Sequence, residues 1–329
     1  MRRLRAYIRK ENTMSRYRDE DYDDYEDGDR PQPRRNKKRR RRSHWYIWVL
    51  VIILLLAAAW FFLGSQPRGD SADAGARKAG CSTILIAGTD KDGYRTDTIM
   101  LLSVDSANHS AALLSIPRDT YVANTDYSVP KINSACGYAG GGKDGMDELM
   151  KQVKNTLGFM PDGYALVDLD AFVKIVDLMG GVEFDVPMDM QYSDPSQNLY
   201  IDLKAGKQHL DGEKAIELVR FRSGYAMADL TRTEVQRDFV KAAMKQWATP
   251  LNIVKIPTLM SIAQSKVTTD LSSGNMLWLA RTLLGCKLSD MSMDTLPGQA
   301  AYIHGGSYYL ADANAVAALM ESGYSPYRH

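Results

Sequence analysis

Two short apolar runs, residues 99–104 and 111–116, constrain the fold more than any other feature of the chain. Both are rich in Ile, Val and Leu and are bounded by charged or turn-forming residues, which is typical of buried β-strands. The segment between them, residues 105–110, has the composition of a turn. We therefore predict that the two runs form a β-hairpin.

Further strands and helices alternate along the rest of the chain. Apolar strands are predicted at residues 82–87, 164–167, 182–186, 291–296 and 300–310. Helices are predicted at residues 144–157, 170–179, 211–220, 230–247 and 314–320. Alternation of strands with helices of this length favours an α/β domain with helices on both faces of a sheet, hence three αβα layers.

The first 44 residues of the 329-residue chain differ in kind from the remainder. An acidic, tyrosine-rich run at residues 18–27 precedes a basic run at residues 34–42, and aliphatic residues are scarce. Such a segment cannot bury a core, so a disordered tail is predicted for residues 1–44. The charges of the acidic run and the basic run nearly cancel. The formal net charge of the whole chain is +1.

An uncharged apolar segment, residues 45–63, follows the basic run directly. As a helix it reaches about 28 Å, roughly the thickness of a bilayer core. Trp45, Tyr46, Trp48 and Trp60 are placed like interfacial aromatic residues, and the preceding basic run favours a cytoplasmic N-terminus. We predict one transmembrane helix at 45–63, a flexible Gly/Ala-rich stalk at 64–80 and an extracytoplasmic domain at 81–329.

The N-terminal region allows two other interpretations. The basic run could bind nucleic acid, but its position beside the apolar segment favours a lipid bilayer as the partner, and no nucleic acid is expected. A cleaved signal peptide is the other alternative, although residues 45–63 are long for the apolar region of a signal sequence.

Charged residues cluster in two places within the predicted domain. The first cluster lies at strand ends and comprises Asp90, Arg95, Asp97, Arg118 and Asp119. The second comprises Arg220, Arg222, Asp229, Arg232, Gln236 and Arg237. Arg232 and Gln236 are four residues apart and share one helix face. Carboxylates interleaved with arginines suit a phosphate and its metal, whereas solvated surface arginines paired with nearby acids are the alternative for the second cluster.

The order of motifs through both clusters resembles the LytR-CpsA-Psr family of cell-wall glycopolymer ligases. The motifs are Gly88-Thr-Asp90, Arg95-x-Asp97-Thr98-x-Met100, Leu114-Ser-Ile-Pro-Arg118-Asp-Thr120, Lys131-Ile-Asn-Ser-Ala, Phe172-x-x-Ile-Val-Asp-x-x-Gly-Gly-Val182, Leu210-Asp-Gly-Glu213-x-Ala, and Arg220-x-Arg222 followed by Asp229-x-x-Arg232-x-x-x-Gln236. The resemblance covers roughly residues 82–247. It implies a central mixed sheet and a membrane anchor.

The resemblance also implies residue roles. Asp90 and Asp97 correspond to a pair that holds a divalent ion, Mg²⁺ or Mn²⁺, against the pyrophosphate of a polyprenyl-linked donor. The arginines that grip the phosphates would be Arg95, Arg118, Arg220, Arg222 and Arg232, with Gln236 as a hydrogen-bonding neighbour and Asp229 orienting them. Arg118, Asp97 and Asp90 would be the catalytic residues.

The implied activity is Mg-dependent transfer of an anionic glycopolymer from a polyprenyl-pyrophosphate-linked donor to peptidoglycan. Two alternatives are kept: a polyprenyl-pyrophosphate hydrolase, and a non-enzymatic wall-binding or regulatory membrane protein. The family keeps the lipid in an apolar tunnel, for which the candidates here are Met150, Val153, Leu157, Phe172, Ile175, Val176, Phe239 and Met244. Each of these is also an ordinary core residue by its spacing.

Other chemistries find little support in the sequence. The five histidines show no metal-ligand spacing, which argues against a zinc site, and Ser115 lies in no G-x-S-x-G motif. The three cysteines show no C-x-x-C spacing. A disulfide between Cys136 and Cys286 is one hypothesis for a domain outside the cell.

Overall fold

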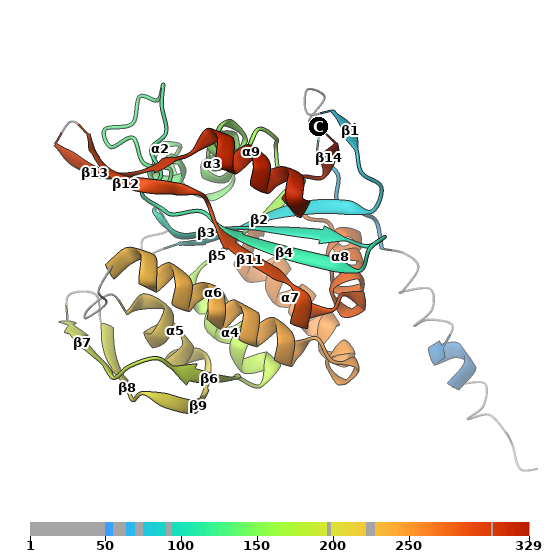
Figure 1. Ribbon diagram of the computed structural model, residues 1–329. Coiled ribbons are helices and arrows are strands. Elements are labelled where there is room, and N and C mark those ends of the chain that lie inside the picture. Colours follow the sequence, from blue (N-terminus) through green and yellow to red (C-terminus); the bar gives the residue numbers. More distant parts are fainter. Residues whose placement is uncertain are drawn as a thin grey trace, which may run out of the picture. The chain divides into compact units, whose positions relative to one another are not determined.

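The computed structural model describes residues 50–54, 64–69, 75–89, 94–195, 199–221, 228–303 and 305–328. The centre of the domain is a six-stranded mixed sheet (Figure 1). In spatial order its strands are β10 (Val267–Thr269), β5 (Gly163–Val167), β2 (Cys81–Thr89), β3 (Thr96–Asp105), β4 (Ser110–Ser115) and β11 (Ser292–Thr295). Strand β2 is antiparallel to β3 and parallel to β5, so the predicted mixed α/β sheet is confirmed.

The predicted hairpin is also confirmed, because β3 and β4 pair in antiparallel register from Met100 and Ser115 to Asp105 and Ser110. Side chains alternate between the two faces of these strands. Leu101 and Leu114 enter a core on one face, while Leu102 and Leu113 enter a core on the other. A sheet buried on both faces explains the continuous apolar runs in the sequence.

Helices cover the sheet on both faces, which gives three layers (Figure 1). One face packs against α2 (Ser134–Tyr138), α3 (Gly142–Leu157) and α9 (Ala313–Leu319). The other packs against α8 (Ser273–Gly285) and one side of α6 (Ala228–Trp247), through Trp278, Val240 and Met244. The remaining helical segments are α7 (Ile256–Lys266), η2 (Pro250–Lys255), η3 (Leu288–Asp290) and η4 (Met320–Tyr324).

A third apolar cluster lies on the opposite side of α6 and extends the domain beyond the central sheet. It joins α4 (Leu169–Met179) and α5 (Gly212–Arg220) to two small hairpin-like ribbons. The ribbons pair β6 (Val182–Val186) with β9 (Gly206–Leu210), and β7 (Met190–Asp194) with β8 (Leu199–Leu203). Asp211 caps α5, since its carboxylate accepts the Lys214 N–H at 2.9 Å.

The C-terminal part departs from the prediction at residues 300–310. This segment is a hairpin of β12 (Gly298–Ile303) and β13 (Gly306–Ala311), separate from the central sheet. Gly305 stands at the turn with φ of 81°, a conformation that glycine adopts without steric cost. The hairpin extends away from the sheet (Figure 1).

The predicted stalk, residues 64–80, is docked on the domain wherever it is described. Ser65 N donates to Gly274 O at 3.0 Å, and Gly69 N donates to the Asp162 carboxylate at 2.7 Å. Arg77 forms an ion pair of 2.7 Å with the buried Asp162, and β1 (Ala76–Arg77) pairs with β14 (Tyr327–Arg328). These residues are therefore part of the folded domain rather than a flexible connection.

Two further predictions concern the N-terminal region and the cysteines. Most of the predicted transmembrane segment, 45–63, and all of the predicted tail, 1–44, lie outside the described residues. Among the residues that are described, no helix is both long and apolar enough to cross a bilayer. The prediction of a disulfide between Cys136 and Cys286 is wrong, because Cys286 is a free thiol. Cys136 lies in α2 on one side of the sheet and Cys286 packs against the core on the other.

Candidate functional site

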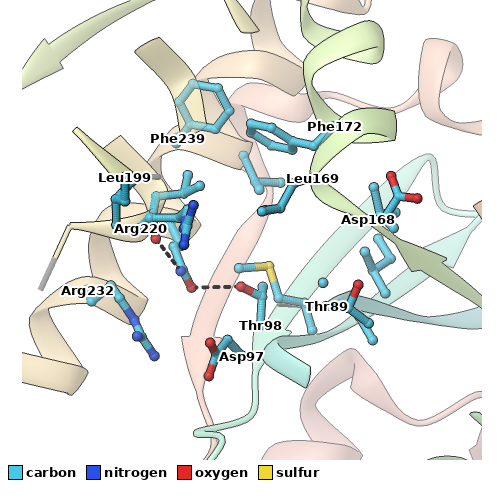
Figure 2. Close-up of a pocket in the computed structure, with 18 of the residues that line it drawn as sticks. Thr89, Asp97, Thr98, Asp168, Leu169, Phe172, Leu199, Arg220, Arg232 and Phe239 are labelled. Carbon is cyan, nitrogen blue, oxygen red and sulfur yellow. Dashed lines mark hydrogen bonds between the residues drawn. The ribbon is translucent and has the colours of Figure 1, made fainter. Parts of the chain in front are cut away.

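A cavity of about 360 Å³ opens at the edge of the sheet where β2 ends and β3 begins. Its walls come from β2, β3, α4, α5, α6 and the β7–β8 ribbon. Figure 2 shows Asp97 and Arg232 around one end of the cavity, with Leu169, Phe172 and Phe239 around the other. The cavity therefore has a charged end and an apolar end.

Asp97 reaches the charged end because of a β-bulge. Gly88 pairs with Thr98 and Thr89 pairs with Thr96, so Asp97 is the additional residue of β3 at this step. Bulges are frequent beside active sites because they redirect a side chain without ending the sheet. Arg118, which follows β4, donates from Nη1 to Asp97 Oδ1 at 2.6 Å.

The segment after Arg118 continues this charged network. Lys131 Nζ lies 2.8 Å from Asp119 Oδ1 and 5.5 Å from the centre of the Tyr308 ring. Tyr309 N donates to Asp119 O at 2.9 Å, which fastens the β12–β13 hairpin beside Arg118. Lys131 belongs to a motif of the sequence, but no role was predicted for it.

Helix α6 contributes Arg232 and Gln236 on one face, as their spacing predicts. Gln236 links three elements, because its Oε1 accepts the Thr98 hydroxyl at 3.2 Å and its Nε2 donates to Val219 O at 2.8 Å. Arg232 lines the cavity with only 2% of its surface exposed. A guanidinium is rarely buried to this extent, and its charge favours an anionic ligand in the cavity.

Arg220, the last residue of α5, also lines the cavity. The structure thus brings together Asp97, Arg118, Arg220, Arg232 and Gln236 from both predicted clusters. The alternative of a solvated surface arginine is wrong for Arg232, which is buried, while Arg220 is half-buried. Arg95 precedes β3 and is exposed, and it does not line the cavity.

Three predicted site residues have no described side chain. Asp90 and Arg222 lie outside the described residues, and Asp229 is described only as a backbone position of α6. Asp97 is therefore the one predicted metal ligand whose side chain can be placed. Groups of three or more His, Cys, Asp or Glu arranged to hold a metal do not occur among the described residues.

Apolar side chains from β2, β3, β5, β8, α4, α5 and α6 also line the cavity. They are the side chains of Ile86, Met100, Val167, Leu169, Phe172, Leu199, Val219, Phe239 and Val240. Of the predicted tunnel residues, Phe172 and Phe239 are present. The prediction is wrong for Met150, Val153 and Leu157, because α3 packs on the opposite face of the sheet. Val176 belongs to the third apolar cluster and Met244 packs against the α8 side of the sheet.

Sequence reasoning missed Thr89 and Asp168 as lining residues. Asp168 is the N-cap of α4, and its carboxylate accepts the Ala171 N–H at 2.6 Å. A usable signal existed, since Asp168 directly follows a strand that is parallel to β2. The carboxyl ends of parallel neighbours lie at the same edge of a sheet, which is where ligands bind in α/β folds.

Together, the fold and the cavity define an α/β domain suited to a ligand with an anionic head and an apolar tail. The chain matches the profile of the LytR_cpsA_psr family over residues 65–323. The protein therefore belongs to the LytR-CpsA-Psr family.

Named relatives include transferases and a regulator. The chain is 31% identical over 225 residues to the polyisoprenyl-teichoic acid–peptidoglycan teichoic acid transferase TagV of Bacillus subtilis, covering 67% of this chain and 56% of that protein. It is 31% identical over 231 residues to the transferase TagU of Oceanobacillus iheyensis, covering 69% of this chain and 70% of that protein. The chain is also 32% identical over 194 residues to the regulatory protein MsrR of Staphylococcus aureus, covering 57% of this chain and 56% of that protein. The match with TagV thus spans little more than half of that protein.

The crystal structure of B. subtilis TagV has the same fold. Its TM-score is 0.63 at 27% sequence identity, and the alignment covers 77% of this chain and 100% of the crystallised one. The predicted family and the predicted mixed α/β architecture are confirmed by these findings.

Proposed function

We propose that the protein transfers an anionic glycopolymer from a polyprenyl-pyrophosphate-linked donor to peptidoglycan. The observation that carries this proposal is one cavity with the buried Arg232 and Asp97 at one end and Leu169, Phe172 and Phe239 at the other, with Arg220 also in its lining (Figure 2). Arg118, Arg220 and Arg232 suit a pyrophosphate, because guanidinium groups bind phosphate oxygens in a bidentate manner and stay charged. The apolar end suits the first part of a polyprenyl chain.

The transferase names of TagV and TagU support the same substrate class. In the proposed reaction, a sugar hydroxyl of peptidoglycan attacks the phosphorus that carries the glycopolymer. A new P–O bond forms, the bond to polyprenyl phosphate breaks, and the hydroxyl proton passes to water or to the departing phosphate. Such phosphoryl transfer depends mainly on positioning and on stabilisation of negative charge.

A divalent ion fits the residues at the charged end. Mg²⁺ usually takes one or two carboxylates and completes its coordination with substrate phosphate oxygens and water. Asp97 offers one carboxylate there, and Asp90, which follows the lining residue Thr89, would offer a second. Mg²⁺ or Mn²⁺ bound by these two residues would neutralise part of the pyrophosphate charge.

The chain's own residues have separate tasks in this proposal. Arg118, fixed by Asp97 at 2.6 Å, would hold a phosphate oxygen at the mouth of the cavity. The buried Arg232 would bind the more deeply placed phosphate. Gln236 joins β3, α5 and α6 through its two hydrogen bonds, and so keeps the walls of the cavity at a fixed separation.

The proposal is tested with the full-length chain in detergent, a lipid-linked anionic glycopolymer and peptidoglycan. We expect glycopolymer to become attached to peptidoglycan in the presence of Mg²⁺, and Asp97→Ala to abolish the attachment while the protein stays folded. Donor consumption that is equally fast without peptidoglycan would indicate the hydrolase instead. Full transfer by Asp97→Ala would contradict the proposed site.

A further inference from the structure

Residues 250–266, the η2–α7 strip, present apolar side chains at the surface of the domain. Leu251 and Val254 on η2 are 85% and 79% exposed. Because side chains three positions apart in a 3-10 helix lie one above the other, these two form a single apolar surface. None of the eleven residues of α7 is buried, although Ile256 and Leu259 are among them. Exposed apolar surface of this kind marks an interaction site.

The strip also carries positive charge and no acidic side chain. Residues 248–269 contain no Asp or Glu, and their two charged residues are Lys255 and Lys266. Lys266 is exposed at the last position of α7. An apolar surface with basic residues suits the interface of a bilayer with anionic headgroups, where lysine meets lipid phosphate and apolar side chains enter the acyl region.

The chain that follows the predicted transmembrane segment 45–63 is fixed directly to α8. Gly64 lies so close to this helix that a Cβ there would be 3.1 Å from Trp278 N. Ser65 N donates to Gly274 O at 3.0 Å. A bilayer-spanning segment that ends at residue 63 therefore leaves no flexible linker, and the bilayer surface would lie against the start of α8.

The η2–α7 strip starts from the same point of the domain. Gln264, in the last turn of α7, donates from Nε2 to Ser273 Oγ at 2.7 Å, and Ser273 is the first residue of α8. The eleven residues of α7 span about 16 Å, and η2 directly precedes them. The exposed Leu251 and Val254 thus lie about one helix length from the place where the bilayer is expected.

Helix α4 connects the strip to the apolar end of the cavity. Its first four residues include Leu169 and Phe172, which line the cavity (Figure 2). Its last residue, Met179, accepts a hydrogen bond of 3.1 Å from Lys255 Nζ at the end of η2. Because α4 also has eleven residues, a bilayer on the strip would lie about 16 Å from the place proposed for the polyprenyl chain.

We propose that the η2–α7 strip lies in the headgroup region of the bilayer, with Leu251 and Val254 among the acyl chains and Lys266 level with the lipid phosphates. This contact holds the apolar end of the cavity close to the membrane that contains the donor. The inference rests on the proposed function for the lipid-linked donor and on the predicted transmembrane segment for the anchor. The contact itself is measured without any reaction.

The test places a spin label on the full-length chain in nanodiscs that contain phosphatidylglycerol. Leu251→Cys is labelled in a Cys286→Ser background, because Cys286 is half-buried whereas Cys81 and Cys136 are buried. Power saturation with oxygen and with a water-soluble nickel chelate shows the surroundings of the label. Lipid admits oxygen and excludes the chelate, water admits the chelate, and a protein contact restricts both.

Two further labelled positions calibrate the measurement. Tyr302→Cys is the matched control, because Tyr302 is 77% exposed on the β12–β13 hairpin. Leu54→Cys, at the middle of residues 45–63, is the reference for the lipid interior. We expect the ratio of oxygen to nickel accessibility to be severalfold higher at position 251 than at 302, and highest at position 54, as interfacial insertion requires.

Each outcome decides the inference. A lipid-like ratio at position 251 together with a water-like ratio at 302 supports it. Equal, water-like ratios at 251 and 302 overturn it. Low accessibility of position 251 to both reagents would assign the strip to a protein contact, such as a second copy of the chain, and also overturns it, as does a water-like ratio at position 54. If transfer fails while the label at 251 stays in lipid, the proposed reaction is wrong and the membrane contact remains.

Discussion

The Arg118–Asp97 ion pair allows catalysis and stability to be separated by a single substitution, Arg118→Ala. The pair has an N···O distance of 2.6 Å, and its side chains are 20% and 29% exposed. Solvent screens a pair at this depth, so its contribution to folding is about 1 kcal/mol. For a domain of this size, the expected loss is about 2–4 °C in Tm.

The expected loss of activity is far larger. Arg118 would stabilise negative charge that grows on the transferring phosphate, and removal of one such preorganised donor commonly slows a reaction by about 10²- to 10³-fold. A fold that is weakened by about 1 kcal/mol remains almost fully populated, because native domains have about 5–15 kcal/mol of stability. Unfolding therefore cannot account for a loss of that size.

The assay counts glycopolymer joined to peptidoglycan by the full-length chain in detergent, alongside a thermal unfolding curve for each variant. Lys143→Ala is the matched control, because the exposed Lys143–Asp147 pair on α3 has the same 2.6 Å distance but is remote from the cavity. We expect the control to retain full transfer and to unfold at nearly the same temperature as the unchanged chain, because solvent screens an exposed ion pair. Retention of more than a tenth of the transfer rate by folded Arg118→Ala would refute the reasoning.

Two further predictions follow from the cavity and from a half-buried carboxylate, that of Glu148. Leu169→Trp narrows the apolar end of the cavity. Binding of a donor with a long polyprenyl chain should therefore weaken, while a donor with a short chain should bind as before. Equal effects on the binding of both donors would contradict a lipid site there. The Tyr127 hydroxyl, 2.6 Å from Glu148, holds the pKa of that carboxyl below its ordinary 4.5. Glu148→Gln should therefore cost about 1–3 kcal/mol in urea unfolding at pH 7. The difference from the unchanged chain should shrink as pH falls from 4.5 through the lower pKa of the folded state, because the unfolded form is protonated first and both forms are protonated below that pKa. A difference independent of pH would contradict this.

Much of the central sheet could be predicted because both of its faces are buried. The runs 99–104 and 111–116 had to be strands of a covered sheet, and the turn between them fixed their antiparallel pairing. Helix ends could also be predicted where a single residue fixes them locally. Asp211 is the N-cap of α5, and Gly158 ends α3 with φ of 85°. The hairpin at residues 298–311 was less readable, because its only break is Gly305-Gly306.

The apolar lining of the cavity could not be predicted from spacing. An apolar stripe along a helix indicates that one side of the helix is buried, but it does not indicate against which layer of the domain that side packs. Val153 on α3 and Phe172 on α4 have equivalent patterns, yet α3 lies on the far face of the sheet and α4 beside the cavity. The charged residues were more predictable, since Arg232 and Gln236 are four positions apart and share one helix face wherever the helix packs.

The bulge at Asp97 explains why the order of residues alone hides the geometry of the charged end. In a regular strand, Thr96 and Thr98 would share one face and Asp97 would project from the other. The register instead sets Thr96 opposite Thr89 and Thr98 opposite Gly88, so Asp97 adds a residue to β3 without a step in β2. Thr98 can then bond Gln236 on α6 while Asp97 receives Arg118 from the end of β4. A single additional residue thus joins the two charged clusters, which lie more than a hundred positions apart in the sequence, at one cavity.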